Sequence, residues 1–398
     1  MVGVLLQLSA GPVMWQALSF PVNLGLLVVL LVLILLLHLL EHKVYAFGFL
    51  RTFIAAVPAL VIAALLTVCM GLIKQQPDGA APVDCMGFTR MTSSWPFVLI
   101  YLYLVLILGL AILHRARTFH LRDLPFMLNH LGLFVVLVAA ALGSADTRKL
   151  TMNITRDMPE WQAVDAQGRV VEMPVALQLI DFNIEEYPPK LMLIDNRTGH
   201  EIPRGKPLTL TVDEKFHSGT LGGWTFTLVK RIENSAPTST RDTTYYVPWN
   251  STGAMCALYV TARNEQTQQG GARKLLEKSG WVTCGSYLFP YQTLVLDDNV
   301  SLVMADREPR SFVSKVQALT RDGQNVISTI EVNKPLSLNG WKIYQLNYDT
   351  SRGKWSEVSV LQLVKDPWLP AVYAGILMLA VGAVWIIFSA HKRKEDEK

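Results

Sequence analysis

Five long apolar runs constrain the fold of this chain more than any other feature of its sequence. A helix needs about 20 apolar residues to cross the hydrocarbon core of a bilayer, and five stretches reach or approach this length. Each ends in an abrupt change to polar or charged residues. The predicted spans are residues 21–40, 53–73, 95–113, 126–143 and 369–390. The chain is therefore predicted to be a polytopic α-helical membrane protein of about five spans.

The overall composition is the average of two kinds of segment, one almost free of charge and one of ordinary polarity. Hydrophobic residues make up 51% of the chain and charged residues 17%, against about 25% charged residues in typical soluble domains. Residues 1–40 contain no Asp, Glu, Lys or Arg, whereas charges recur at ordinary density from 144 to 366. We therefore expect a large water-exposed domain between the last two spans.

The segment 144–366 has the pattern of an all-β domain. Short alternating or β-branched runs are bounded by Gly, Asn, Asp and Pro, as in 175–184, 224–229 and 326–332. About 220 residues suffice for one β sandwich or barrel-like domain with its own core. Residues 233–255 and 264–276 are polar and rich in Ser, Thr, Gln and Gly, and they are predicted to form long loops.

Basic residues predict how the chain is oriented in its membrane. The loops 41–52 and 114–125 and the tail 391–398 together carry nine Lys and Arg residues, whereas the short loop on the opposite side carries only Lys74 and Arg90. Because Lys and Arg in short loops favour the cytoplasmic side, the basic loops are predicted to be cytoplasmic. This predicts an inner-membrane, multi-pass protein whose β domain lies in the periplasm.

The first 20 residues form an apolar segment that does not have the pattern of a signal peptide. They are apolar, lack the cationic region of a signal peptide and include Gly11-Pro12 after the first apolar turns. Our hypothesis is an exterior stub that is the remnant of a further helix, with the true start upstream. The predicted organisation is this stub and four further parts: a four-helix membrane region 21–143, the periplasmic β domain 144–366, a last span 367–390 and a cytoplasmic tail 391–398.

Composition and cysteine spacing exclude several classes of function. The net charge of +4 is too small and too scattered for a nucleic-acid-binding protein. The four cysteines form no CxxC or CxxCH motif, which argues against a zinc knuckle, a thioredoxin-type site or an attached c-type haem. Cys256 and Cys284 fall in the predicted periplasmic domain, where a disulfide would close a loop of about 28 residues and contribute roughly 3 kcal/mol.

The predicted β domain offers no complete catalytic set of its own, so enzyme activity stays an open question. His200 and His217 lie in polar contexts typical of solvated imidazoles, and no GxSxG motif is present.

Two histidines inside the predicted spans are the strongest candidates for a site. His38 lies about one turn before the end of the first span and His130 about one turn into the fourth. Because these helices run in opposite directions, both imidazoles are expected at similar depth. An imidazole Nε2 at that depth can ligate haem iron, although packing or interhelical hydrogen bonding is the competing interpretation. His42, His114, His120 and His391 border the basic loops and are predicted to be interfacial.

Several motifs in this order resemble a known family. The segment 125–143, which contains His130-Leu-Gly, is followed by Leu150-Thr-Met-Asn-Ile154. Further motifs occur at 180–191, 333–336, 340–345, 354–355 and 366–368. This arrangement resembles the ResB family of cytochrome c biogenesis proteins, the CcsB half of the fused CcsBA synthases of system II.

The resemblance implies a division of labour with a partner. Such proteins work with a CcsA/ResC half to bring haem to the outer face and to join its vinyl groups to the CxxCH thiols of apocytochrome c. The family's membrane histidine maps onto His130, which the resemblance makes an axial ligand of haem b in transit. Since the second ligand comes from the partner, His38 is a weaker candidate. The WWD segment belongs to the partner and is absent here, so the chain is expected to be incomplete alone.

Two further interpretations stay open from the residues. In one, His38 and His130 jointly ligate a haem of a b-type membrane anchor in a respiratory oxidoreductase. In the other, the chain is a membrane-tethered β binding module whose histidines only pack.

Overall fold

The protein was analysed as a computed structural model, which describes residues 1–76, 82–240, 243–267 and 273–396. The chain divides into two compact units. The helical unit comprises residues 1–150, 165–169 and 364–398, and the β unit comprises residues 151–164 and 170–363. Each unit is described by itself.

Among the described residues, five helices are long and apolar enough to cross a membrane, which confirms the predicted spans. Their surfaces are broadly apolar; Phe53 and Leu72, for example, are 88% and 82% exposed. So much exposed apolar surface is typical of contact with lipid rather than water. The five helices are α2 (Val22–Leu40), α4 (Phe53–Leu72), α5 (Trp95–Arg117), α6 (Leu124–Gly143) and α7 (Leu369–Asp396).

The first residues of the chain form a short helix built into the helical unit. Helix α1 (Val2–Ala10) packs against the start of α5. The Trp95 amide donates a hydrogen bond to Gln7 Oε1 at 3.1 Å, and the Trp95 indole Nε1 donates to the Gly11 carbonyl at 2.9 Å. That this segment is the remnant of a further helix stays a prediction. The remaining short helices are η1 (Trp15–Leu18), α3 (Tyr45–Phe49), η2 (Phe88–Ser93) and η3 (Leu121–Asp123).

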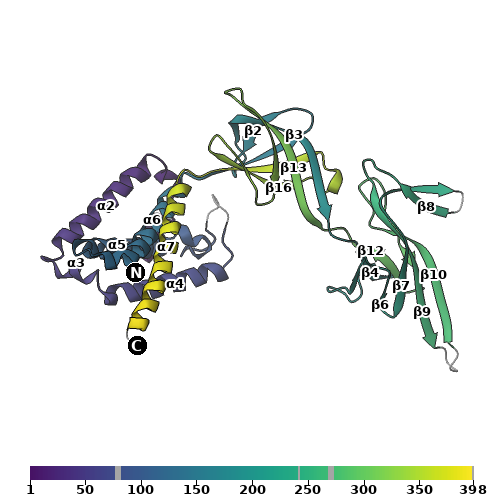
Figure 1. The fold of residues 1–398 in the computed structure, drawn as a ribbon, viewed down its shortest axis with the longest axis horizontal. Helices are drawn as coiled ribbons and strands as arrows, with labels where there is room; N and C mark the ends of the chain where they lie inside the picture. The colour runs from purple at the N-terminus through teal and green to yellow at the C-terminus, as the bar shows by residue number, and fades with distance from the viewer. Residues whose placement is uncertain (77–81, 241–242, 268–272, 397–398) are drawn as a thin grey trace. The chain divides into compact units, whose positions relative to one another are not determined.

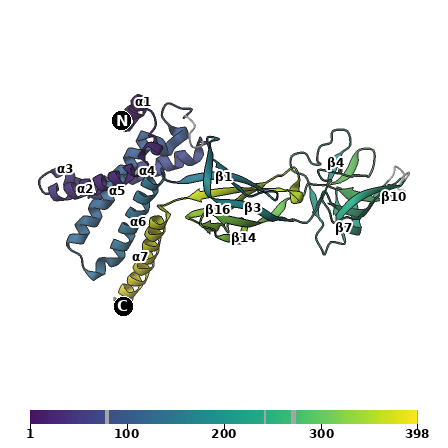
Figure 2. The ribbon, with the colours of Figure 1, turned by 90° about the horizontal axis from the view of Figure 1, so that it is seen from above.

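Helices α6 and α7 pack side by side through glycines (Figures 1 and 2). A Cβ atom at Gly132 would lie 2.7 Å from the Gly375 carbonyl oxygen, and one at Gly375 would lie 2.8 Å from the Gly132 carbonyl oxygen. Small residues let two helix backbones approach closely in a membrane, where packing replaces the hydrophobic effect as the main attraction. This seam fixes the last span against the helix that carries His130.

Asp146 joins the ends of three spans at the face opposite the basic loops. Its Oδ1 accepts a hydrogen bond from the Phe20 amide at 2.7 Å, just before α2. Its Oδ2 accepts hydrogen bonds from Asn23 Nδ2 and from the Trp368 indole Nε1, both at 2.7 Å. Burial alone would raise the pKa of Asp146, but these three donors and the charge of Arg148 hold it below its ordinary value. The ionised carboxylate thereby links α2, α6 and α7.

The β unit contains an eight-stranded sheet that nearly closes on itself. The strand order is β14-β13-β3-β2-β1-β17-β16-β15, and β14 also contacts β15 and β16 at the far end. Figure 2 shows β3, β14 and β16 within this curled sheet. Its strands are β1 (Arg148–Thr155), β2 (Glu160–Val164), β3 (Val170–Glu186), β13 (Pro309–Thr320), β14 (Asn325–Glu331), β15 (Leu336–Leu338), β16 (Trp341–Tyr348) and β17 (Val358–Lys365).

Two smaller sheets are inserted between β3 and β13, which pair with one another. Both contribute to one core, in which Phe226, Leu258 and Leu302 are fully buried. The four-stranded sheet contains β4 (Lys190–Asp195), β5 (Thr209–Thr211), β11 (Leu294–Val295) and β12 (Val300–Met304). The five-stranded sheet contains β6 (Ser218–Leu221), β7 (Trp224–Thr240), β8 (Thr243–Pro248), β9 (Met255–Thr267) and β10 (Arg273–Thr283). The all-β prediction is confirmed. The unit contains two sheet systems rather than one: the eight-stranded sheet, and the two smaller sheets that share a core.

The two predicted long loops are wrong over most of their length. Much of 233–255 forms the end of β7 and strand β8, which pair in register from Ser235↔Pro248 to Thr240↔Thr243. Most of 264–276 belongs to β9 and β10; residues 241–242 and 268–272 lie outside the described chain. Thr is a good strand former even where the segment is polar on both faces, so polarity alone was a poor sign of a loop.

Replacing Asp146 by Ala is expected to destabilise the helical unit by about 3 kcal/mol, because three donors, among them the buried Asn23 and the half-buried Trp368, lose a charged acceptor at once. Asp146→Asn keeps one acceptor oxygen and should cost less. Thermal unfolding of the full chain in detergent measures both, with Asp157→Ala in an exposed turn as the control. Equal midpoints for Asp146→Ala and the control would show that this carboxylate does not join the spans.

Candidate functional site

His130 lies in the first half of α6 and is held in one tautomer by its own helix. Its Nδ1 lies 3.0 Å from the Phe126 carbonyl oxygen, one turn earlier. Because a carbonyl can only accept, Nδ1 must carry the proton, and the lone pair of the neutral ring is then on Nε2. The ring is half-buried and stacks on Phe126, with centroids 3.7 Å apart. This is the state in which an imidazole binds a metal through Nε2.

The neighbours of His130 fix its position on the helix. Asn129 Nδ2 donates to the Pro125 carbonyl at 3.0 Å, and the Asn129 side chain packs where a Cβ at Gly382 of α7 would lie 2.4 Å away. The Arg115 guanidinium carbon lies 5.9 Å from the centroid of the Phe126 ring. The imidazole is thus held by the ring and the carbonyl of Phe126, and its neighbour Asn129 packs in the α6–α7 seam.

His38, the second predicted ligand, is buried at the end of α2. It is 4% exposed, and its Nδ1 lies 3.4 Å from Glu41 Oε2. Neither atom has a hydrogen-bond partner. No hydrogen bond or ring contact joins His38 to His130 in the described part of the chain. Matched depth of the two imidazoles therefore stays a prediction.

Glu41 is a site residue that the sequence reading missed. Its side chain is only 2% exposed, and it is surrounded by basic side chains at the end of the spans that carries the basic loops. The signal in the sequence was its i,i+3 spacing from His38, which places both on one helix face. The groups within 4 Å of its carboxylate are His38, His42, Arg51, His114 and Arg117.

The histidines that border the basic loops are accessible. The side chains of His42, His114 and His120 are 69%, 50% and 79% exposed; His391 lies where side chains are not described. Arg51 Nη1 donates to His114 Nδ1 at 2.7 Å, so this imidazole nitrogen accepts and is unprotonated. Asp123, also buried at this end, forms an ion pair with Arg115.

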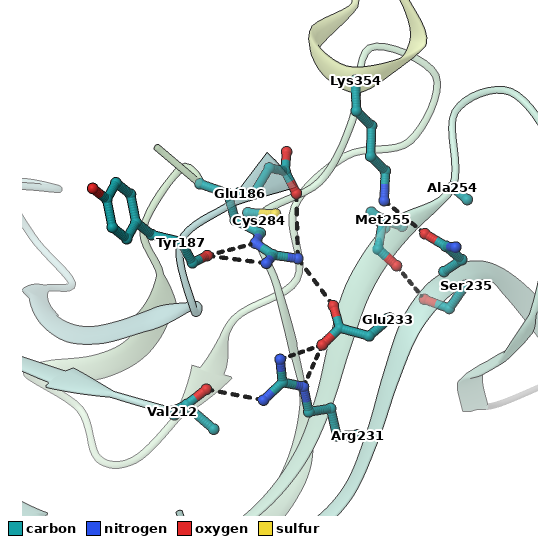
Figure 3. Close-up of polar contacts among 12 residues, drawn as sticks. Glu186, Tyr187, Val212, Arg231, Glu233, Ser235, Ala254, Met255, Cys284 and Lys354 are labelled. Carbon is teal, nitrogen blue, oxygen red and sulfur yellow. Dashed lines mark hydrogen bonds and ion pairs between the residues drawn. The ribbon is translucent and has the colours of Figure 1, made fainter. Parts of the chain in front are cut away.

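A second polar cluster lies at the neck of the β unit, where the chain leaves β3 and returns to β13 (Figure 3). Arg307 Nη1 lies 3.2 Å from Glu186 Oε2 and 3.0 Å from Glu233 Oε2. Its Nε and Nη2 donate to the Tyr187 carbonyl at 3.2 and 3.0 Å. A planar guanidinium can serve such divergent acceptors at once, which an ammonium cannot. Arg307, only 12% exposed, thus ties the two sheet systems together.

Arg231 extends this neck cluster. It pairs with Glu233 and donates to the Val212 carbonyl at 3.1 Å. Partial burial would raise the pKa of Glu233, but the charges of Arg231 and Arg307 hold it below its ordinary value. Since the folded pKa is lower than the unfolded one, this group stabilises the β unit at neutral pH, and the contribution is lost as the pH falls through the acidic range.

The turn η4 (Gly353–Trp355) adds two contacts at the same neck. Lys354 Nζ donates to Asn234 Oδ1 at 2.7 Å, and the Trp355 indole Nε1 donates to the Ala254 carbonyl at 2.9 Å. These residues come from the stretch after β16 and reach β7 and the start of β9. Contacts at the neck therefore come from the segment that follows β3, from the segment that precedes β13 and from the turn η4.

Cys256 and Cys284, the predicted disulfide pair, share one core cluster and are free thiols here. The last register pair of β9 and β10 is Ala257↔Thr283. Continued by one residue, this register would place Cys256 opposite Cys284, and opposite residues in antiparallel strands have a Cα separation that a disulfide can bridge. Burial raises the pKa of Cys256 to about 12 and also raises that of Cys284, so neither suits a nucleophilic role. The disulfide stays a prediction.

The imidazoles within the spans and the neck cluster of the β unit differ in the chemistry that they can support. No group of three or more His, Cys, Asp or Glu side chains in the described residues could hold a metal ion. Single imidazoles with a fixed tautomer can instead ligate an iron whose other ligands belong to a porphyrin and a partner. The membrane imidazoles are thus the candidate site, and the neck cluster is structural support for the β unit.

Five candidate spans and a large all-β insertion before the last span define a multi-pass membrane protein with an extramembrane β unit. Residues 290–357 match the model of the ResB-like family. The match includes Arg307, Lys354 and Trp355 of the neck. This similarity supports a ResB-like protein and, at the level of that family, a link to cytochrome c biogenesis. No curated protein matches the chain.

Replacing Arg307 by Lys is expected to cost the β unit about 2 kcal/mol, because an ammonium cannot keep both carboxylates and the Tyr187 carbonyl as acceptors. Hydrogen exchange should then speed up at the Tyr187 amide, which bonds the Glu308 carbonyl at 2.9 Å. Arg321→Lys, at an exposed turn, is the matched control. Unchanged exchange at Tyr187 in Arg307→Lys would contradict this role.

Proposed function

We propose that this chain is the CcsB-type subunit of a system II cytochrome c synthase. With a CcsA/ResC-like partner that carries the WWD segment, it would move haem b to the periplasmic face of the inner membrane and present apocytochrome c for thioether formation. The observation that carries the proposal is His130, an imidazole inside a candidate span with Nδ1–H bonded to the Phe126 carbonyl and Nε2 left as a ligand.

The distribution of charge supports the proposed orientation. Arg51, Arg115 and Arg117 lie at the same end of the spans as Glu41 and Asp123, and basic residues favour the cytoplasmic side. Asp146 joins the opposite ends, where the chain passes into β1. In this orientation His130 lies on the cytoplasmic half of α6, and the β unit lies in the periplasm.

His130 can contribute binding and orientation to the reaction. Its Nε2 would serve as one axial ligand of the transported haem, and the helix holds the proton on Nδ1 throughout. Haem supplies the vinyl groups and iron chemistry, so the protein's part is positioning in a site from which water is excluded.

The β unit offers an edge for an extended apocytochrome segment. Strand β8 pairs only with β7 among the described strands, and an open edge can accept one more strand through main-chain hydrogen bonds. Exposed Tyr245 and Trp249, at 38% and 46%, would add apolar contacts beside that edge.

Co-expression with a CcsA/ResC-like partner tests the role of His130. His130→Ala should lower the yield of holocytochrome c by at least about tenfold, the usual scale for loss of support to a metal site. Added imidazole should restore part of this yield, because it can occupy the vacated position.

His120→Ala is the matched control, since its imidazole is 79% exposed at the same end of the helices. A full cytochrome yield in His130→Ala, at normal protein levels, would contradict the proposal.

A further inference from the structure

Among the described residues, His38 Nδ1 and Glu41 Oε2 are the two buried side-chain polar atoms that lack a hydrogen-bond partner. They face one another at 3.4 Å. Burial of both atoms without a hydrogen bond is costly, and such groups inside membrane proteins tend to be kept for function. The pair therefore calls for a role beyond packing.

Glu41 is held so that one oxygen is left for His38. Arg51 Nη1 donates a hydrogen bond to Oε1 at 3.2 Å. His42 Nε2, His114 Nδ1 and Arg117 Nη1 lie 3.6, 3.8 and 3.9 Å from the same oxygen. Oε2, by contrast, lies 3.4 Å from His38 Nδ1 and has no hydrogen-bond partner among the described residues. The guanidinium groups of Arg51 and Arg117 also offset the unfavourable position of a carboxylate at the C-terminal end of α2.

The arrangement of carboxylate and imidazole matches that of a supported metal ligand. A ligating histidine commonly donates its other ring N–H to a carboxylate or a carbonyl, which fixes the tautomer and makes the ligating nitrogen more basic. In His130 the Phe126 carbonyl does this. In His38 the Glu41 carboxylate is placed to do it, since a contraction of about 0.5 Å would bring 3.4 Å to an ordinary N–H···O distance.

We propose that Glu41 is a positioning residue that holds the proton of His38 on Nδ1, so that His38 Nε2 is a second axial ligand site for haem at the basic ends of the spans. This inference rests on the proposed function for haem as the transported group. It assigns haem binding to His38 separately from His130, and it explains why a carboxylate, Glu41, is buried beside His38.

The tautomer can be tested without haem. In the full chain labelled with ¹⁵N-histidine, the resonances lost in His38→Ala identify this ring. They should report Nδ1–H in the wild type and a changed tautomer balance in Glu41→Gln. Asp123→Asn, which alters another buried carboxylate at the same end, should leave them unchanged. A His38 ring with its proton on Nε2 in the wild type would overturn the proposal.

Haemin titration of the purified full chain tests ligation separately from His130. In a His130→Ala background, haemin binding with the absorption spectrum of imidazole ligation should persist. Adding His38→Ala should abolish it, and adding Glu41→Gln should weaken it by about 10–100-fold and raise the midpoint potential of the bound haem. Asp123→Asn should change neither quantity.

The two proposals fail in different ways. Haemin binding that vanishes in His130→Ala alone would overturn the role of His38 and leave that of His130 standing. Haemin binding that persists in His130→Ala, together with full cytochrome maturation by that variant, would overturn the proposed role of His130 and support that of His38. Equal haemin affinity and potential in Glu41→Gln and in its parent would overturn the role of Glu41.

Discussion

A bilayer offers no water to a polar side chain, so every imidazole, amide and carboxylate within the spans must find a partner in the protein or in a ligand. The structure meets this constraint at most positions. Asn23 is fully buried and bonds Asp146 and the Leu142 carbonyl, and the Tyr101 hydroxyl donates to the Leu137 carbonyl at 2.8 Å. His130 satisfies Nδ1 on its own helix. These satisfied groups make the unsatisfied pair at the end of α2 informative.

The same constraint explains how the helical unit is held together. Its apolar helices gain little from contact with one another relative to lipid, so close packing at glycines and a few strong hydrogen bonds carry the association. Gly132 and Gly375 bring α6 and α7 together, and Trp368 both packs against Gly143 and donates to Asp146. The residue just before the last span is thereby fixed to the helix that holds His130. In the β unit, where water is present, a charged neck around Arg307 does the corresponding work.

Hydropathy and charge distribution predicted the spans, and strand alternation predicted the β unit, because both depend on local patterns that a single sequence displays. The histidines within the spans were also visible as polar residues in apolar runs. Glu41 was not singled out, since its burial depends on groups from α2, α5 and the segment before α4 that meet only in the fold. Arg307 was missed for the same reason: Glu233 and Tyr187 are 74 and 120 residues away. The β7–β8 ribbon was mistaken for a loop because its polar Ser and Thr residues hide the strand pattern.

His130 is proposed to ligate haem through Nε2, and exchange of the ligand tests this role most directly. In the complex with a CcsA/ResC-like partner, His130→Cys should still bind haem but replace imidazole by sulfur ligation. The absorption and electron paramagnetic resonance spectra of the ferric haem should then change from a histidine to a thiolate signature. A ferric spectrum identical to that of the wild-type complex, at equal haem content, would contradict the account.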